Sequence, residues 1–237
     1  MKVDKYSGRV LQGPVHDIYV YEAPVRLWHW ITVAMMFPLI ITGYLIGDPP
    51  LPVYVGGEAT EIYTFAWVRI IHFACAMIFT VALGMRIYWA FVGNHHARSI
   101  FLPPVWRFSW WKGLWDQAMY YLFVNKESPS WIGHNPLAQI AMCAMFFLGS
   151  LFIIITGFAL YAQQWSWGEG WMFLFSWVHK LFGSTQAVRT AHHLAMYYLI
   201  IFSMAHMYMV FREDIMGHES VIGTMVNGIR MFKTKEH

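Results

Sequence analysis

The sequence predicts an all-α integral membrane protein, with a bundle of four transmembrane helices and further helices at the membrane interface. Its 237 residues are 58% hydrophobic and only 12% charged, whereas soluble domains carry about 25% charged residues. Aromatic residues make up 19% of the chain, and the tryptophans gather near the ends of apolar runs, as in an aromatic belt. Four of these runs each reach the ~20 residues needed to cross about 30 Å of hydrocarbon.

The expected spans, in chain order, cover residues 26–46, 65–92, 137–161 and 191–211. The segment 104–124 holds tryptophans near helical spacing but is too polar to span, so we expect an interfacial helix on the cytoplasmic surface. The run Trp171–Phe182 is too short to span and is expected on the outer surface. No segment has the composition of a separate soluble domain, so residues 1–237 are expected to form a single membrane domain.

The distribution of lysine and arginine predicts a multi-pass protein of the cytoplasmic (inner) membrane with both termini cytoplasmic. The side with fewer basic residues holds Arg69, Lys180 and Arg189. The N-terminal 25 residues are polar and mixed, so we expect the first span to act as a retained signal anchor rather than a cleaved signal peptide. Because membrane orientation accounts for the excess of basic over acidic residues, nucleic acid is not expected as a partner. The basic residues on the cytoplasmic side are Lys2, Lys5, Arg9, Arg26, Arg86, Arg98, Arg107, Lys112, Lys126, Arg212, Arg230, Lys233 and Lys235.

Both cysteines, Cys75 and Cys143, lie inside expected spans, and the chain has no CxxC or CxxCH motif. Covalent c-type haem and a protein-borne iron–sulfur cluster are therefore not expected. No glycine-rich phosphate loop follows a strand pattern, so nucleotide and flavin binding have no support either.

Four histidines, His29, His72, His192 and His206, sit inside the apolar stretches. A histidine in lipid needs a hydrogen-bond or metal partner, so such a residue is a functional candidate. His192 and His206 are fourteen residues apart, close to four helical turns, which puts both rings on one face about 21 Å apart.

Depth in the membrane sorts the four histidines into pairs, because successive spans run in opposite directions. His72 and His192 fall near the outer ends of their spans, and His29 and His206 near the inner ends. This pattern predicts two b-type haems, each held by two neutral imidazoles as axial ligands to the iron. The alternative is that each histidine makes an ordinary polar contact between helices.

His193 is the nearest rival to His192, but it is thirteen residues from His206, which turns it roughly 220° round the helix. The other histidines, among them His16, His95, His96, His179, His218 and His237, fall in tails and loops and are expected at the surface.

Three arginines, Arg26, Arg69 and Arg189, each precede a proposed ligand by three residues and so lie one turn away on the same face. Arginine suits carboxylates, and haem carries two propionates. We therefore expect these side chains to bind propionates; the alternative is that they snorkel from helix ends to the surface.

The third span begins with Gly-His-Asn-Pro-Leu-Ala-Gln at 133–139. A quinone head group needs hydrogen bonds at its carbonyls and a proton source on reduction, and His134, Asn135 and Gln139 could supply both. Alternatively, Asn135 caps the helix and Gln139 bonds a neighbouring helix. A weak repeat, Ile-Thr-Gly-Tyr at 41–44 and Ile-Thr-Gly-Phe at 155–158, places Gly43 and Gly157 where a helix or a flat cofactor could approach.

With these residues in place, the chain resembles the b-type cytochrome subunit of membrane-bound nickel–iron hydrogenases from about Tyr21 to Arg230. The histidine frame alone is also similar to four-helix di-haem cytochromes of formate dehydrogenases. The stretches that carry the likeness are YEAPVRLWHW at 21–30, RIIHF at 69–73, RIYWAFVGN at 86–94, GHNPLAQ at 133–139, AHHLAM at 191–196, AHMYMVFRED at 205–214 and VIGTMVNGIR at 221–230.

The resemblance implies a cytochrome b that anchors a hydrogenase. Its partners would be a large subunit with the nickel–iron site and a small subunit with iron–sulfur clusters, both on the outer face. Electrons from hydrogen would cross two haems b to quinone, and the family's ligand pattern falls on His29, His72, His192 and His206.

Three other functions stay open from the sequence. The same scaffold could serve another donor, such as a formate dehydrogenase, which co-purifying subunits would reveal. A non-redox membrane anchor would contain no haem. A metal-ion transporter is disfavoured because the spans lack the acidic residues such pathways use.

Overall fold

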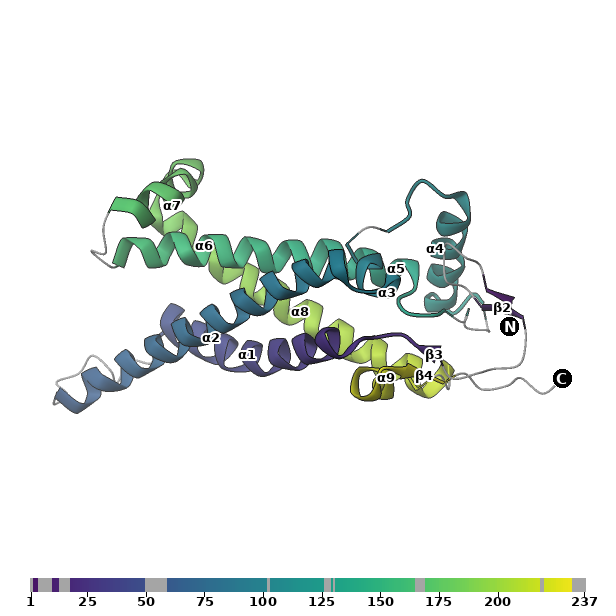
Figure 1. Ribbon diagram of the computed structural model, residues 1–237. Coiled ribbons are helices and arrows are strands. Elements are labelled where there is room, and N and C mark those ends of the chain that lie inside the picture. Colours follow the sequence, from purple (N-terminus) through teal and green to yellow (C-terminus); the bar gives the residue numbers. More distant parts are fainter. Residues whose placement is uncertain are drawn as a thin grey trace. The chain divides into compact units, whose positions relative to one another are not determined.

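Four long helical segments dominate the computed structural model, and they correspond to the four expected spans (Figure 1). Helix α1 covers Ala23–Gly47 and α2 covers Ala59–Val92. The third segment joins α5 (Pro136–Ile140), the π-helix η2 (Ala141–Phe147) and α6 (Leu148–Gln164). The fourth is α8, Thr185–Gly217. The structure describes residues 2–3, 10–12, 18–49, 59–101, 103–125, 129, 131–164, 169–217 and 220–231.

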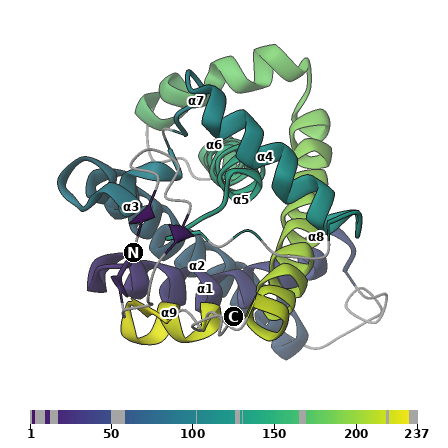
Figure 2. The same cartoon turned by 90° about the vertical axis from the view of Figure 1, so that its right-hand side faces the viewer.

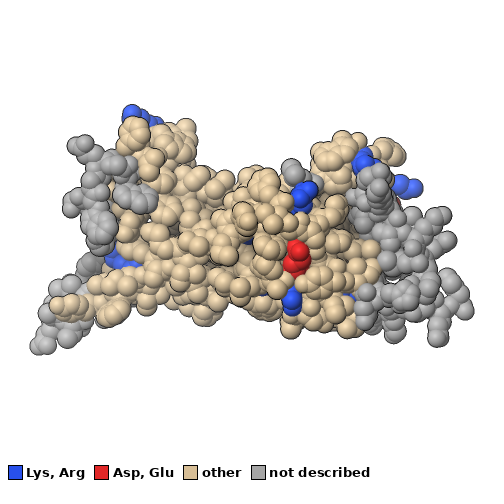
Figure 3. Space-filling view, viewed as in Figure 1, with Lys and Arg blue, Asp and Glu red and all other residues tan. Residues whose placement is uncertain are grey.

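Each of the four segments is long and apolar enough to cross a membrane. Large apolar side chains such as Phe37, Val81 and Ile201 are exposed on them, and the face in Figure 3 is largely uncharged over the described residues. A helix surface of this kind is stable in lipid, where the backbone is already satisfied internally. The prediction of a multi-pass, helical membrane protein is confirmed.

The helices are longer than the apolar runs that predicted them. Helix α8, for example, continues past residue 211 through Arg212, Glu213 and Asp214. Hydropathy locates the part of a helix that lipid can cover, whereas the backbone hydrogen bonds continue until a cap or breaker ends them. The π-helical stretch in the third segment has no hydropathy signal at all.

Shorter helices fall where interfacial helices are expected. Helix α4 (Phe108–Tyr121) packs on α5, and α7 (Glu169–Phe182) packs on α6 (Figure 1). Two further short helices are α3 (His95–Ser99) and α9 (Val221–Asn227). Their location at the membrane surface stays a prediction.

The all-helical expectation misses two small antiparallel strand pairs. Strand β1 (Lys2–Val3) pairs with β2 (Val10–Gln12), and β3 (Ile18–Tyr19) pairs with β4 (Ile229–Arg230). Strands of two or three residues are too short to show the alternating pattern by which strands are predicted.

The chain separates into two compact units, which are described individually. The first unit comprises Met1–Trp30, Gly84–Phe146 and Ser203–His237, and the second comprises Ile31–Leu83 and Phe147–Phe202. Each of the four long segments contributes residues to both units.

Hydrogen bonds between distant motifs hold the first unit together. One oxygen of Glu22 accepts from Trp89 Nε1 and from the backbone N–H of Asn94, each at 2.9 Å. Arg26 and Trp30 at the start of α1 donate to backbone carbonyls of α9, which lies beside α1 in Figure 2.

The turn after α9 requires glycine. Gly228 has φ of 85°, and a Cβ there would lie 2.6 Å from the carbonyl oxygen of Tyr21. The close approach lets the Gly228 carbonyl accept from the backbone N–H groups of Val20 and Tyr21. The two ends of the described chain are thereby joined at β3 and β4.

Candidate functional site

His72 of α2 and His192 of α8 line one cavity of about 550 Å³ in the second unit. This volume lies within the ~300–1,000 Å³ range of cofactor sites. All four long segments contribute to its lining, which is mainly apolar and includes Gly43 and Gly157.

The Nδ1 atoms of this pair face threonine hydroxyls. Thr42 Oγ1 lies 2.9 Å from His72 Nδ1, and Thr156 Oγ1 lies 2.9 Å from His192 Nδ1. Each threonine belongs to one copy of the Ile-Thr-Gly repeat. The other ring nitrogen, Nε2, is the atom that each histidine has available for a metal.

His29 of α1 and His206 of α8 form the second pair, which lies in the first unit. Their ring centroids are 6.5 Å apart. Two metal–imidazole bonds of about 2.0 Å, with roughly 1.1 Å more from nitrogen to ring centre on each side, would separate the centroids by roughly 6.2 Å. The pair therefore has the spacing of two axial ligands to one iron.

The chemistry of both pairs also fits haem. His29 Nδ1 is buried without a hydrogen-bond partner among the described residues, and a buried polar atom of this kind calls for a ligand nearby. Neither Asp nor Glu is among the described residues that line the cavity of the second unit. Neutral nitrogen donors in an apolar enclosure suit b-type haem iron.

His193 lines the same cavity as His192, and its Nε2 is buried without a hydrogen-bond partner among the described residues. Its ring stacks on Tyr197 at 5.2 Å and packs so closely on α1 that a Cβ at Gly47 would lie 2.3 Å from it. The choice of His192 rather than His193 as the haem ligand stays a prediction. Of the other histidines, His179 bonds the backbone of Ala159, and His95 and His96 lie in α3. His16, His218 and His237 lie outside the described residues.

The three arginines expected at propionates have different surroundings. Arg69 and Arg189 line the cavity together with His72 and His192. Arg26 instead donates through Nη1 to the carbonyl of Val226, while its Nε is buried without a partner among the described residues. Lys5, Arg9, Lys126, Lys233 and Lys235, which support the predicted orientation, lie outside the described residues.

The residues expected at a quinone already have partners within the first unit. Asn135 caps α5 through Ala138 N at 2.7 Å, and its amide nitrogen donates to the Tyr121 hydroxyl. Gln139 is buried, accepts from Trp110 Nε1 at 2.8 Å and donates to the His134 carbonyl. These hydrogen bonds are the ones expected if Asn135 caps the helix and Gln139 bonds a neighbouring helix.

His134 differs from the two amides because only one of its ring nitrogens, Nδ1, is used in a hydrogen bond described here. Its Nδ1 lies 2.8 Å from the Tyr21 hydroxyl. The pKa of His134 is lowered to about 3, mainly by burial and further by unfavourable interactions of its protonated form with neighbouring basic groups that include Arg86 and Arg230. The ring is therefore neutral at pH 7. Burial also raises the pKa of Tyr21, so the phenol keeps its proton.

A sequence profile of the prokaryotic cytochrome b561 family matches residues 20–228. The chain belongs to this family. It is 50% identical over 219 residues to a probable Ni/Fe-hydrogenase B-type cytochrome subunit of Azotobacter vinelandii, covering 91% of this chain and 89% of that protein. It is 48% identical over 217 residues to the probable Ni/Fe-hydrogenase 1 B-type cytochrome subunit of Escherichia coli K12, covering 91% of each. It is 43% identical over 217 residues to a probable Ni/Fe-hydrogenase B-type cytochrome subunit of Rhodobacter capsulatus, covering 92% of this chain and 82% of that protein.

Membership in the cytochrome b561 family confirms the predicted haem b chemistry and the helical membrane fold. The resemblance seen in the sequence to hydrogenase cytochromes agrees with the names of these relatives. How many haems bind, and through which histidines, stays a prediction.

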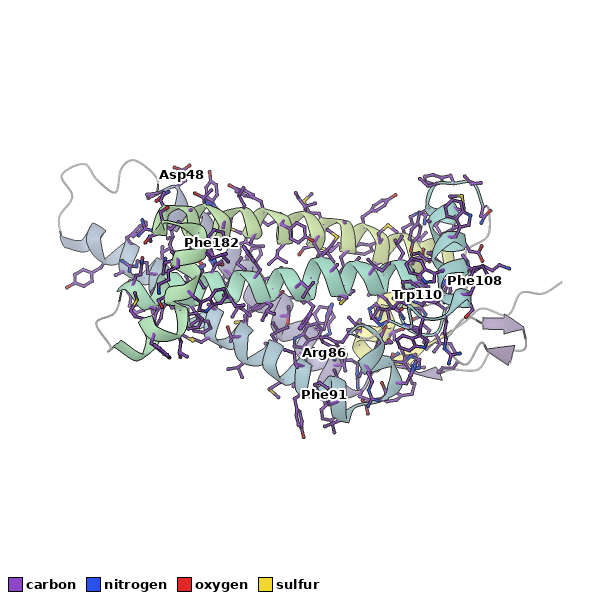
Figure 4. The ribbon with its side chains drawn as sticks, turned by 90° about the horizontal axis from the view of Figure 1, so that it is seen from above. Asp48, Arg86, Phe91, Phe108, Trp110 and Phe182 are labelled. Atoms are coloured by element: carbon purple, nitrogen blue, oxygen red, sulfur yellow. The ribbon has the colours of Figure 1, made fainter. Side chains whose placement is uncertain are left out.

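Sequence reasoning used Arg86 only as one of the basic residues on the cytoplasmic side. Its side chain is 1% exposed, donates to the Ala97 carbonyl at 2.7 Å and lies between the rings of Trp28 and Phe101. Figure 4 marks it on α2, five residues before the outward-pointing Phe91. Two of its nitrogens have no hydrogen-bond partner among the described residues. Thr42 and Thr156 were also missed as partners of histidines, although the Ile-Thr-Gly repeat signals them.

Proposed function

We propose that this cytochrome b561 family member is the electron-transfer subunit of a membrane-bound nickel–iron hydrogenase. Relatives that match 91% of this chain are named probable Ni/Fe-hydrogenase B-type cytochrome subunits. The partners would be the iron–sulfur small subunit and the nickel–iron large subunit, so the hydrogen-splitting site is not on this chain. The complex as a whole would act as a hydrogen:quinone oxidoreductase in the cytoplasmic membrane.

The observation that carries the proposal is the presence of one histidine pair in each unit. His72 and His192 would hold the haem nearer the outer surface, and His29 and His206 would hold the inner one. When bound, haem b supplies a one-electron couple. The chain's own contribution is to present two neutral imidazoles at each site and, around His72 and His192, to provide a mainly apolar lining that excludes water.

Arg69 and Arg189 support the outer site, since both line the cavity that His72 and His192 share. A guanidinium can bind a carboxylate with two parallel hydrogen bonds. We propose that these two arginines bind the propionates of the outer haem, and that Arg26 plays the same part at the inner haem through its buried Nε.

We place quinone reduction at the cytoplasmic end, near His134, Asn135 and Gln139. Of these residues, His134 supports the site best, because the amides are already engaged. Proton uptake there, combined with proton release by hydrogen oxidation outside, would charge the membrane. A formate dehydrogenase as donor is the second candidate, favoured only by the shared histidine frame; the names of the relatives favour hydrogen.

Alanine variants of the four histidines test the proposal by haem content. The purified wild-type complex should contain two non-covalent haems b per chain. Each of His29→Ala, His72→Ala, His192→Ala and His206→Ala should reduce the pyridine haemochrome signal by about half, because an axial ligand is lost. His193→Ala is the matched control and should keep both haems. Loss of haem from His193→Ala but not from His192→Ala would contradict the assignment.

A further inference from the structure

The two histidines of the second unit share a hydrogen-bonding arrangement that was not evident from their sequence neighbourhoods. The Oγ1 atoms of Thr42 on α1 and Thr156 on α6 each lie 2.9 Å from a histidine Nδ1. The two threonines are on different helices, and their histidines, His72 and His192, are on two others. The same contact has therefore been built twice around one cavity.

The direction of these hydrogen bonds follows from where each hydroxyl proton goes. Thr42 Oγ1 is 2.6 Å from the carbonyl oxygen of Pro38, and Thr156 Oγ1 is 2.9 Å from that of Phe152. A carbonyl can only accept, and a hydroxyl has a single proton, so that proton points to the helix backbone. Each threonine oxygen must then accept from the histidine.

It follows that Nδ1 carries the hydrogen in both imidazoles and that Nε2 carries a lone pair. A metal needs the deprotonated nitrogen, and the hydrogen bond at the other nitrogen selects it. Both rings are thus held in the tautomer that presents Nε2 to iron.

The glycine after each threonine completes the arrangement. A Cβ at Gly43 would lie 3.4 Å from His72 Cε1, and a Cβ at Gly157 would lie 3.1 Å from His192 Cε1. A Cβ at Gly157 would press on the edge of the His192 ring, whereas a Cβ at Gly43 would only touch the His72 ring. Each Thr-Gly pair therefore supplies an acceptor for Nδ1 and the space for the ring.

We propose that Thr42 and Thr156 are positioning residues that fix the tautomer and raise the basicity of the two outer haem ligands. The proposal rests on the proposed ligation by His72 and His192. Donation from Nδ1 gives the imidazole a partial negative charge, which stabilises ferric over ferrous iron and lowers the potential of the outer haem. At the inner site, His29 Nδ1 lacks such a partner among the described residues, so the inner haem serves as an internal reference.

The test is a spectroscopic redox titration of the purified complex carrying Thr42→Val, Thr156→Val or both. Valine keeps the shape of threonine and removes the acceptor. Outer-shell changes typically alter metal affinity by about tenfold or more. For each threonine replaced, we expect the outer site's affinity for ferric haem, relative to its affinity for ferrous haem, to fall about tenfold. This change raises the midpoint potential of the outer haem by about 59 mV. The inner haem should keep its potential.

Thr42→Ser and Thr156→Ser are the matched controls, because serine retains the hydroxyl. They should restore the wild-type potential. Loss of the outer haem alone in the valine variants, with serine restoring it, would equally support a positioning role. Wild-type potential and haem content in the double valine variant would overturn the inference, and so would equal shifts in valine and serine variants. If His72→Ala kept both haems, the ligation itself would fail instead.

Discussion

His134 combines burial with a single strong contact, and this combination decides what the residue can do. A phenol is a better donor than a neutral imidazole, so the Tyr21 hydroxyl, 2.8 Å away, donates to Nδ1. The ring hydrogen then lies on Nε2. With its pKa lowered to about 3 by burial and by nearby positive groups, His134 is a neutral hydrogen-bond donor. It could polarise a quinone carbonyl, and it would bind a proton only when negative charge develops beside it.

Replacing His134 tests this role. In His134→Phe, quinone reduction by hydrogen should fall by about 10²-fold, the usual contribution of a positioned acid or base, while reduction of the haems by hydrogen continues. The ratio of wild-type to variant rate should stay constant between about pH 6 and 8, since a group with so low a pKa does not titrate there.

His95→Phe is the control for His134→Phe, because His95 is exposed on α3. The double variant Asn135→Leu with Gln139→Leu asks whether the amides also bind quinone. Unchanged quinone reduction in the double variant and in His134→Phe would move the site elsewhere.

Some individual residues could be assigned from the sequence and others could not. The helical period places His192 rather than His193 on the same helix face as His206, because a fixed rotation of 100° per residue converts spacing into direction. The partners of a side chain on another helix do not follow from spacing. Arg86 and Thr42 illustrate this, since their roles come from contacts with Ala97 and with His72.

At the scale of elements, the stretches that carry the family resemblance mostly build the scaffold of the first unit. The stretch 21–30 meets 86–94 through Glu22, and it meets 221–230 through Arg26 and Trp30. The stretch 133–139 supplies a helix cap and the Gln139–Trp110 bond. The strongest sequence signals are therefore contacts between helix ends as well as haem ligands.

Glu22 is the clearest test of this scaffold, because one of its oxygens accepts two hydrogen bonds. Glu22→Ala should leave the Trp89 indole N–H and the Asn94 backbone N–H without an acceptor. An unsatisfied donor costs about 1–3 kcal/mol when it is fully buried. Both donors here are partly buried, so we expect a loss near the lower end of this range and a lower thermal unfolding midpoint of the detergent-solubilised protein. Glu22→Gln keeps an acceptor oxygen and should lose less. Equal stability of Glu22→Ala and wild type would show that α1 and α2 are held by other contacts.

The positions of the helices could be predicted well because hydropathy and length report directly on lipid contact. The boundaries could not, since Arg212 to Asp214 continue α8 beyond its apolar part. The π-helix at Ala141–Phe147 could not be predicted either. Its seven residues are all apolar, and hydropathy does not distinguish π-helical from α-helical hydrogen bonds. Strands β3 and β4 join residues more than 200 positions apart, which no local pattern can reveal.

For the molecule as a whole, one proposed pair of haem ligands lies in each of the two units, and the proposed order of the electron path comes from the membrane depth expected of each pair. The outer pair, His72 and His192, lies in the second unit, and the inner pair, His29 and His206, lies in the first. Depth in the membrane could be inferred from the alternation of spans and from basic residues. The docking face of the hydrogenase subunits could not, because nothing in one chain records its partners' surfaces.

Ligand loss at one site at a time tests the order in the intact hydrogenase complex. In His206→Ala, hydrogen should still reduce the outer haem without added quinone, but quinone reduction should fall to the level of a complex lacking this chain. In His72→Ala, hydrogen should reduce neither the remaining haem nor quinone, because the entry site is missing. Hydrogen oxidation with a soluble dye should stay normal in both variants and show that the partner subunits are intact. The two variants differ only in which of the two haems is lost. Rapid reduction of the remaining haem by hydrogen in His72→Ala would therefore place electron entry at the inner site and reverse the proposed direction.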